Sequence, residues 1–228
     1  MADRNLINSA HHRDTKNVVF FLGYSLAEDP NIPRNTIQYI GSEGTHQDLP
    51  LVCWGDKETG ALGRLPMTIW LAQHIAADRI IWSSGSSRIK DGLYESEFFL
   101  DMALKSFSAL KRDFPHRFND AMWADETVYK QWLESRSICD TKSQFTQDGL
   151  VAARNIIADT YNTNSVMFYA VSSANHAPRV LRDAFKVFEG LQSKVTVCSV
   201  AAETCYGGAT IKDTIVDDLG RFFVPKSH

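Results

Sequence analysis

The stretch that decides the fold runs from an apolar segment into small polar residues, a histidine and an arginine: Val166-Met167-Phe168-Tyr169-Ala170-Val171-Ser172-Ser173-Ala174-Asn175-His176-Ala177-Pro178-Arg179. The apolar part has the pattern of a buried strand. Pro178 suits the first turn of a helix, and apolar residues then recur at helical spacing: Val180, Leu181, Ala184, Phe185 and Phe188. The sequence therefore predicts a strand, a tight loop and a helix.

The loop of this unit is the first candidate site, because ligands of parallel sheets bind at the carboxyl ends of the strands. The hydroxyls of Ser172 and Ser173 and the exposed amides of a helix N-terminus suit an anion. Arg179 adds a charged fork, and His176 can titrate near neutral pH. The alternative is an ordinary loop histidine beside a surface arginine, and the residues leave both interpretations open.

Alternating strands and helices extend in both directions from this unit. Strands are predicted over Asn17 to Leu22, Leu51 to Trp54, Arg79 to Trp82, Ser137 to Cys139 and Lys194 to Val200, and helices over Arg64 to Ala77, Leu93 to Leu110, Thr146 to Thr160 and Asp213 to Phe223. This alternation predicts one α/β domain over residues 1–228, with a parallel sheet and right-handed crossovers. Residues 111–134 are charged and aromatic, and they form a predicted helical insertion or lid within the domain.

Further candidate site residues follow the other predicted strands. Gly23 ends the first strand and permits close approach of a ligand to the backbone. The run Ser84-Gly85-Ser86 leaves the strand after Trp82 and offers amides and hydroxyls to a phosphate or carboxylate, although a plain flexible turn explains the run better on its own. Glu95 and Glu97 lie in the first turn of the next helix, where either carboxylate can cap the helix or take part in acid–base chemistry.

Composition is that of an ordinary globular protein. The 228 residues are 44% hydrophobic and 22% charged, and the formal net charge is −3. Neither the charge nor any basic tract favours nucleic acid as a partner, and no apolar run is long enough to cross a membrane. The four cysteines form no Cys-x-x-Cys pair and no zinc-ligand spacing, so we predict a reduced, cytoplasmic protein without a metal site. A homo-oligomer is compatible with the sequence.

Four patterns together resemble the YdcF-like family, a domain of unknown function shared with SanA-like and ElyC-like proteins. They are the strand ending in Leu22-Gly23, the helix opening at Arg64-Leu65, the turn Ser84-Gly85-Ser86 followed by Glu95-Ser96-Glu97, and Asp140-x-x-Ser143-x-x-Thr146 followed by Ser173-x-x-His176-x-x-Arg179. The last turn is the most specific. The family has asparagine where Phe145 and Asp148 stand, and glutamate where Asp140 stands.

The resemblance implies a Rossmann-like fold and a site at the carboxyl edge of the sheet. The site residues that it implies are Gly23, Arg64, Ser84, Gly85, Ser86, Glu95, Glu97, Asp140, Ser143, Thr146, Ser172, Ser173, His176 and Arg179. It also implies a nucleotide-like ligand, with S-adenosylmethionine as one candidate.

Three functions compete on these residues. The first is an enzyme that acts on a phosphate- or nucleotide-containing small molecule by group transfer or hydrolysis, with His176 as general acid or base and Arg64 and Arg179 on the negative charge. The second is a non-catalytic binder of S-adenosylmethionine or another adenosine-type ligand, which does not require a titrating histidine. The third, a metal-dependent hydrolase using Asp140, Glu95 and His176, has no metal-binding motif to support it.

Overall fold

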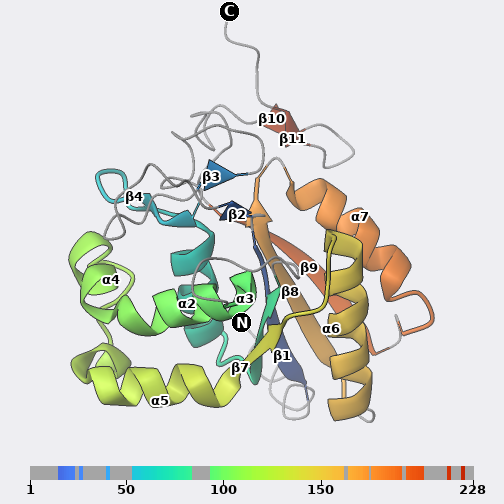
Figure 1. The fold of residues 1–228 in the computed structure, drawn as a ribbon, viewed down its shortest axis with the longest axis horizontal. Helices are drawn as coiled ribbons and strands as arrows, with labels where there is room; N and C mark the ends of the chain where they lie inside the picture. Colours follow the sequence, from blue (N-terminus) through green and yellow to red (C-terminus); the bar gives the residue numbers. More distant parts are fainter. Residues whose placement is uncertain are drawn as a thin grey trace, which may run out of the picture.

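A computed structural model describes residues 15–23, 26–27, 40–41, 53–83, 93–161, 164–174, 176–191, 194–202, 215–216 and 222–223. Within these residues, five parallel strands form one sheet in the order β7-β6-β1-β8-β9. Their bounds are β1 Lys16–Leu22, β6 Arg79–Ser83, β7 Ser137–Asp140, β8 Val166–Ser173 and β9 Val195–Ala202. The predicted α/β, Rossmann-like parallel sheet is confirmed (Figure 1).

The strand order places a topological switch point at the centre of the sheet. The chain begins at β1 and builds outward through β6 to β7, then returns to lay β8 against the other side of β1. Connections therefore leave β1 and β8 in opposite directions, and ligands of open α/β sheets bind outside the carboxyl ends of the strands at such a point. We refer to this position as the β1/β8 crevice. Across this edge Leu22 is paired with Ser83, and Ser83 with Asp140.

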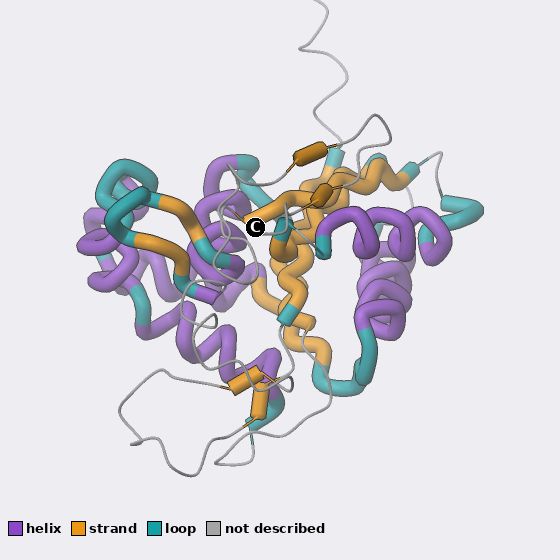
Figure 2. The backbone as a smooth tube through the Cα atoms, turned by 90° about the horizontal axis from the view of Figure 1, so that it is seen from above, coloured by secondary structure: helices purple, strands orange, loops and turns teal. Residues whose placement is uncertain are grey.

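Helices cover both faces of the sheet (Figures 1 and 2). One face carries α2 Arg64–His74, α3 Glu95–Lys105, α4 Phe107–Asp113, the 3-10 helix η2 Ala121–Ala124 and α5 Glu126–Arg136. The opposite face carries α6 Thr146–Thr160 and α7 Ala177–Val187. Because all the crossovers join parallel strands, the N-termini of α2, α3, α6 and α7 lie towards the carboxyl edge of the sheet.

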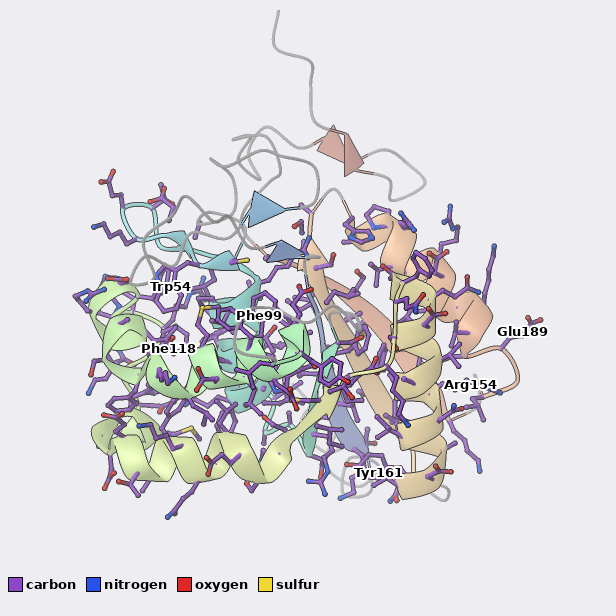
Figure 3. The ribbon with its side chains drawn as sticks, viewed as in Figure 1. Trp54, Phe99, Phe118, Arg154, Tyr161 and Glu189 are labelled. Atoms are coloured by element: carbon purple, nitrogen blue, oxygen red, sulfur yellow. The ribbon has the colours of Figure 1, made fainter. Side chains whose placement is uncertain are left out.

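The central strand β1 is buried on both faces, as its continuous apolar run predicts. Val19 and Phe21 pack among α2 and α3, whereas Val18, Phe20 and Leu22 pack under α6 and α7. Figure 3 shows the two sides: Phe99 and Phe118 lie among α2–α5, and Arg154 and Tyr161 lie along α6. The sheet is thus held by two separate apolar layers.

The segment predicted as a helical insertion contains the end of α4, η2 and most of α5. Its aromatic side chains continue the core of the α2–α5 face, with Phe118 and Trp123 in edge contact at 4.7 Å between ring centroids. The buried Tyr129 hydroxyl donates to the carbonyl of Ala103 at 2.7 Å. This packing attaches the segment firmly to α3, and a lid function stays a prediction.

The predicted strand Leu51 to Trp54 is wrong over its described end, because Cys53 is helical and Trp54 lies in a turn. The physical reason is Gly55, whose φ of 103° reverses the chain. The chain then forms an antiparallel hairpin of β4 Gly55–Asp56 and β5 Ala61–Leu62. A second antiparallel pair joins β2 Leu26–Ala27 to β3 Ile40–Gly41.

Two predicted helices also need correction. The helix predicted over Leu93 to Leu110 is divided at Ser106, whose hydroxyl donates to the carbonyl of Met102 and competes with helical bonding. The C-terminal helix predicted over Asp213 to Phe223 is wrong where the structure describes it. There β10 Ile215–Val216 pairs antiparallel with β11 Phe222–Phe223, as branched and aromatic residues favour.

Among the described residues, no helix combines the length and the apolar character that a membrane crossing requires.

Candidate functional site

A buried arginine ties together the two strands that flank the crevice. Arg64, the first residue of α2, is 3% exposed. Its Nη1 donates to the carbonyls of Leu22 at 3.1 Å and Gly23 at 3.0 Å, at the end of β1. Its Nε and Nη2 donate to the hydroxyl of Ser173 at 3.0 and 2.7 Å, at the end of β8. Arg64, Gly23 and Ser173 therefore form one hydrogen-bonded unit across the switch point.

Close backbone packing fixes the start of α2 and hence Arg64. Gly63 is the N-cap, and its amide donates to the carbonyl of Trp54 at 3.0 Å. A Cβ at Gly63 would lie 2.5 Å from the carbonyl carbon of Trp54, so only glycine allows this approach. The hairpin that precedes α2 thus determines where the guanidinium enters the crevice.

The two helices that flank the crevice begin with arginine rather than with acidic residues. Arg64 in α2 and Arg179 in α7 lie in first turns that contain no carboxylate. By contrast, α3 and α6 have acidic first turns. A cation at the positive end of a helix dipole is unfavourable by itself. The N-termini of both helices lie towards the carboxyl ends of β1 and β8, and helix N-termini of this kind suit an anion.

His176 is the N-cap of α7. Its Nε2 is buried and, among the residues that the structure describes, has no hydrogen-bond partner. Burial, together with the positive charges of Arg64 and Arg179, lowers the pKa of His176 to about 4, and Asp183 opposes this shift. The imidazole is therefore neutral at neutral pH, and it is a weak base until the surrounding charge changes.

Ser172 and Ser173 point to opposite faces of the sheet, as neighbours in a strand must. Ser173 meets Arg64 on the α2 side, so Ser172 faces the side of α6 and α7. Ser172 is 0% exposed, and its hydroxyl has no partner within the described part of the chain. A buried polar atom without a partner carries a desolvation cost that a ligand can relieve.

Arg179 lies at the rim of the crevice. Its side chain is 63% exposed, and its Nε lies 3.6 Å from the carboxylate of Asp183, one turn along α7. Asp183 also forms an ion pair with Arg182, whose Nη2 lies 3.0 Å from Oδ1 of Asp183. An exposed pair of this kind contributes little to stability, and it leaves Arg179 able to reorient towards a ligand.

The two glutamates have different environments, and only one of them is a cap. The Glu97 carboxylate accepts the backbone N–H of Tyr94 at 2.9 Å, which caps α3. Glu95 is 0% exposed on the α2–α5 side. Burial raises the pKa of the nearby Cys53 thiol to about 12, with Arg64 lowering and Glu95 raising it. Glu95 and Arg64 thus share one region, whereas the carboxylate that acts on His176 is Asp183.

Asp140 and Ser143 belong to a separate polar group at the ends of β6 and β7. The buried Asp140 carboxylate accepts the hydroxyl of Ser83 at 3.1 Å and the amides of Lys142 and Ser143 at 3.1 and 3.2 Å. These bonds shape the turn into α6, where Thr146 is the partly buried first residue. On this edge of the sheet, β6 and β1 lie between β7, which carries Asp140, and β8.

The structure therefore brings five predicted residues to the switch point: Gly23, Arg64, Ser173, His176 and Arg179. Ser172 precedes Ser173 in β8 and faces the side of the sheet that α6 and α7 cover. Asp140, Ser143 and Thr146 lie along the same edge, and Glu97 serves its own helix. The predicted residues Ser84, Gly85 and Ser86 lie outside the described residues. Sequence reasoning missed Ser83 and Asp183, although the spacing of four residues from Arg179 to Asp183 on one helix was a usable signal.

The lowered pKa of His176 predicts a specific pH dependence of stability. Above its ordinary value of 6.5 the imidazole is neutral in both the folded and the unfolded state. As the pH falls towards about 4, the unfolded chain takes up a proton that the folded protein resists, so stability is lost. After allowance for partial exposure we expect this group to account for about 1–3 kcal/mol of the loss.

Urea unfolding of the parent and of His176→Gln across this range measures the effect. The variant should lose less stability on acidification, and His74→Gln, which removes a histidine stacked on Trp70, should follow the parent. Parallel curves for the parent and His176→Gln would show that the pKa is not lowered.

Among the described residues, no group of three or more His, Cys, Asp or Glu side chains is arranged to hold a metal ion. Comparison with protein-family models, with curated proteins and with solved structures finds no match. The resemblance to the YdcF-like family stays a prediction.

Proposed function

We propose that this protein is an enzyme that acts on a phosphate- or nucleotide-containing small molecule by group transfer or hydrolysis, and that its substrate anion binds at the β1/β8 crevice. The observation that carries the proposal is the pair of arginines, Arg64 and Arg179, at the N-termini of the two helices that flank the switch point. An anion bound between these helices is stabilised by the positive ends of both helix dipoles and by the charge of the two arginines.

In this proposal Arg64 holds the crevice in shape through its hydrogen bonds to oxygens at the ends of β1 and β8. Arg179 reaches the anion from the rim. The bound negative charge offsets both arginines at His176 and raises its pKa towards the working pH. General acid–base catalysis is most effective in that range, so the substrate itself prepares His176 as the proton-transferring group.

The second candidate is a non-catalytic binder of S-adenosylmethionine or another adenosine-type ligand. The observation that favours it is the low pKa of His176 in the ligand-free protein. A neutral imidazole of this kind is a poor base, but it is a competent hydrogen-bonding group.

A reaction screen separates the two candidates. Purified protein is incubated with nucleoside mono-, di- and triphosphates, with sugar phosphates and with S-adenosylmethionine, while phosphorus NMR and mass spectrometry follow the products. The enzyme proposal expects conversion of at least one phosphate compound that His176→Ala does not convert. Binding of an adenosine compound without any conversion in the whole set would favour the binder.

Arg179 gives a prediction for binding. Arg179→Ala should weaken the binding of a phosphate compound more than Arg179→Lys, and both should weaken it, because lysine keeps the charge but loses the two-pronged geometry. We expect about a tenfold loss for alanine, the size of one charge-assisted hydrogen bond. Calorimetry measures the affinities.

Arg182→Ala is the matched control, because Arg182 has the same exposure and the same partner, Asp183, but does not act on the pKa of His176. Equal losses for Arg179→Ala and Arg182→Ala would reduce the effect to the general charge of α7 and would contradict a specific role for Arg179.

A further inference from the structure

Two buried polar atoms without partners lie at the end of β8 and at the start of α7. They are the hydroxyl of Ser172 and Nε2 of His176, and both lack a hydrogen-bond partner within the described residues. The amide of His176 donates to the carbonyl of Ser173 at 2.9 Å, and the amide of Val180 donates to the carbonyl of His176 at 3.1 Å. The two unpartnered side-chain atoms point to a ligand that would supply the missing hydrogen bonds.

The two atoms reach this turn from different directions. Ser172 is 0% exposed and faces the side of the sheet that α6 and α7 cover, whereas Ser173 on the other side is taken by Arg64. His176 caps the eleven-residue helix α7 directly above. A helix N-terminus of this length supplies backbone amides to an anion, and the side-chain atoms provide a hydroxyl and a ring nitrogen beside them.

We propose that the β1/β8 crevice takes up its anion together with one proton, which His176 holds on Nε2 and donates to an oxygen of the ligand. This inference rests on the proposed anion site and specifies the ligand class: a fully ionised oxyanion of the phosphate or sulfate type, which accepts hydrogen bonds and brings no proton of its own. The proton comes from the solvent, and no covalent bond of the ligand changes in this binding step.

The charges around His176 explain why the anion and the proton arrive together. Arg64 faces the imidazole from α2, and Arg179 and Asp183 face it from α7. Without ligand, burial and the two arginines outweigh the single carboxylate, so the imidazole stays neutral and carries only one ring proton, on one of its two nitrogens. An oxyanion in the crevice adds negative charge beside both arginines, and the protonated imidazole then gains a charge-assisted hydrogen bond.

Sulfate is the suitable probe, because it does not titrate near neutral pH and any proton taken up must bind to the protein. Calorimetric titration with sulfate at roughly pH 6, in two buffers of different ionisation enthalpy, gives the number of protons taken up on binding. We expect more than about half a proton for the parent and almost none for His176→Gln. His74→Gln, whose ring stacks on Trp70 at the far end of α2, should behave as the parent.

A second measurement needs no variant at position 176 that folds. In NMR spectra of the parent, one histidine imidazole should titrate at low pH without sulfate and at distinctly higher pH with saturating sulfate. Sulfate binding without proton uptake, or proton uptake that persists in His176→Gln, would overturn this inference while the anion site remains. Failure of sulfate and of phosphate compounds to bind the parent at all would overturn the proposed function as well.

Discussion

Arg64→Met should lower the free energy of unfolding by about 3 kcal/mol or more, because it removes the donors that serve three oxygens at the centre of the carboxyl edge. Those oxygens are the carbonyls of Leu22 and Gly23 and the hydroxyl of Ser173. Methionine keeps the apolar length of the side chain but donates no hydrogen bond. Both strands at the switch point lose these side-chain hydrogen bonds to α2, although the apolar packing of α2 remains.

Urea unfolding of two further variants tests the reason for this loss. Arg64→Lys keeps the charge, but its ammonium cannot reproduce the planar fork that reaches both strands, so it should be intermediate. Arg182→Met removes an arginine that is 63% exposed on α7 and should change stability by less than about 0.5 kcal/mol. If the free energy of unfolding of Arg64→Met lay within about 1 kcal/mol of the parent value, the hydrogen bonds of Arg64 would not be what holds β1 and β8 to α2.

His176→Ala should lower turnover of the substrate about a hundredfold or more, as expected for loss of a general acid or base. His176→Gln should be almost as slow, since its amide can occupy the position of Nε2 but cannot carry a proton near neutral pH. Both variants should still bind the anion, because Arg179 and the amides of α7 remain. The measurement is turnover of the three proteins from pH 5 to about pH 9, which spans the ordinary pKa of histidine.

The pH profile distinguishes a proton-transferring role from simple hydrogen bonding. The turnover of the parent should change with pH around the pKa of His176 in the substrate complex. The turnover of the two variants should lack this pH-dependent change. If His176→Gln restored most of the activity, His176 would be a hydrogen-bonding residue only. Activity near that of the parent in both variants would remove His176 from the chemistry and would favour the non-catalytic binder.

Local sequence patterns predicted most of the sheet and its helices. The strand β1 and the helix α6 follow directly from apolar runs and spacing, and Pro178 indicates the start of α7. Two of the errors lie where a single local feature decides the structure. At Gly55 a positive φ turns a predicted strand into a hairpin, and at Ser106 a side-chain hydrogen bond divides a helix.

Strand order and side-chain partners required the three-dimensional structure. The sequence predicted parallel strands but could not show that β8 returns to the side of β1 opposite β6, which creates the crevice. It indicated Arg64 and His176 as site residues but not what they contact. Arg64 donates to oxygens at the ends of β1 and β8, and the carboxylate that acts on His176 is Asp183 rather than Glu95 or Glu97. These pairings depend on long-range packing that spacing along the chain does not encode.

The most direct test of the central claim is a crystal structure of the protein soaked with AMP, which carries both a phosphate and an adenosine. The proposal predicts the phosphate at the β1/β8 crevice, hydrogen-bonded to Nε2 of His176 and to amides of the first turn of α7, with Arg179 turned from Asp183 towards it. AMP bound at another part of the surface, with Nε2 of His176 still without a partner, would contradict the claim.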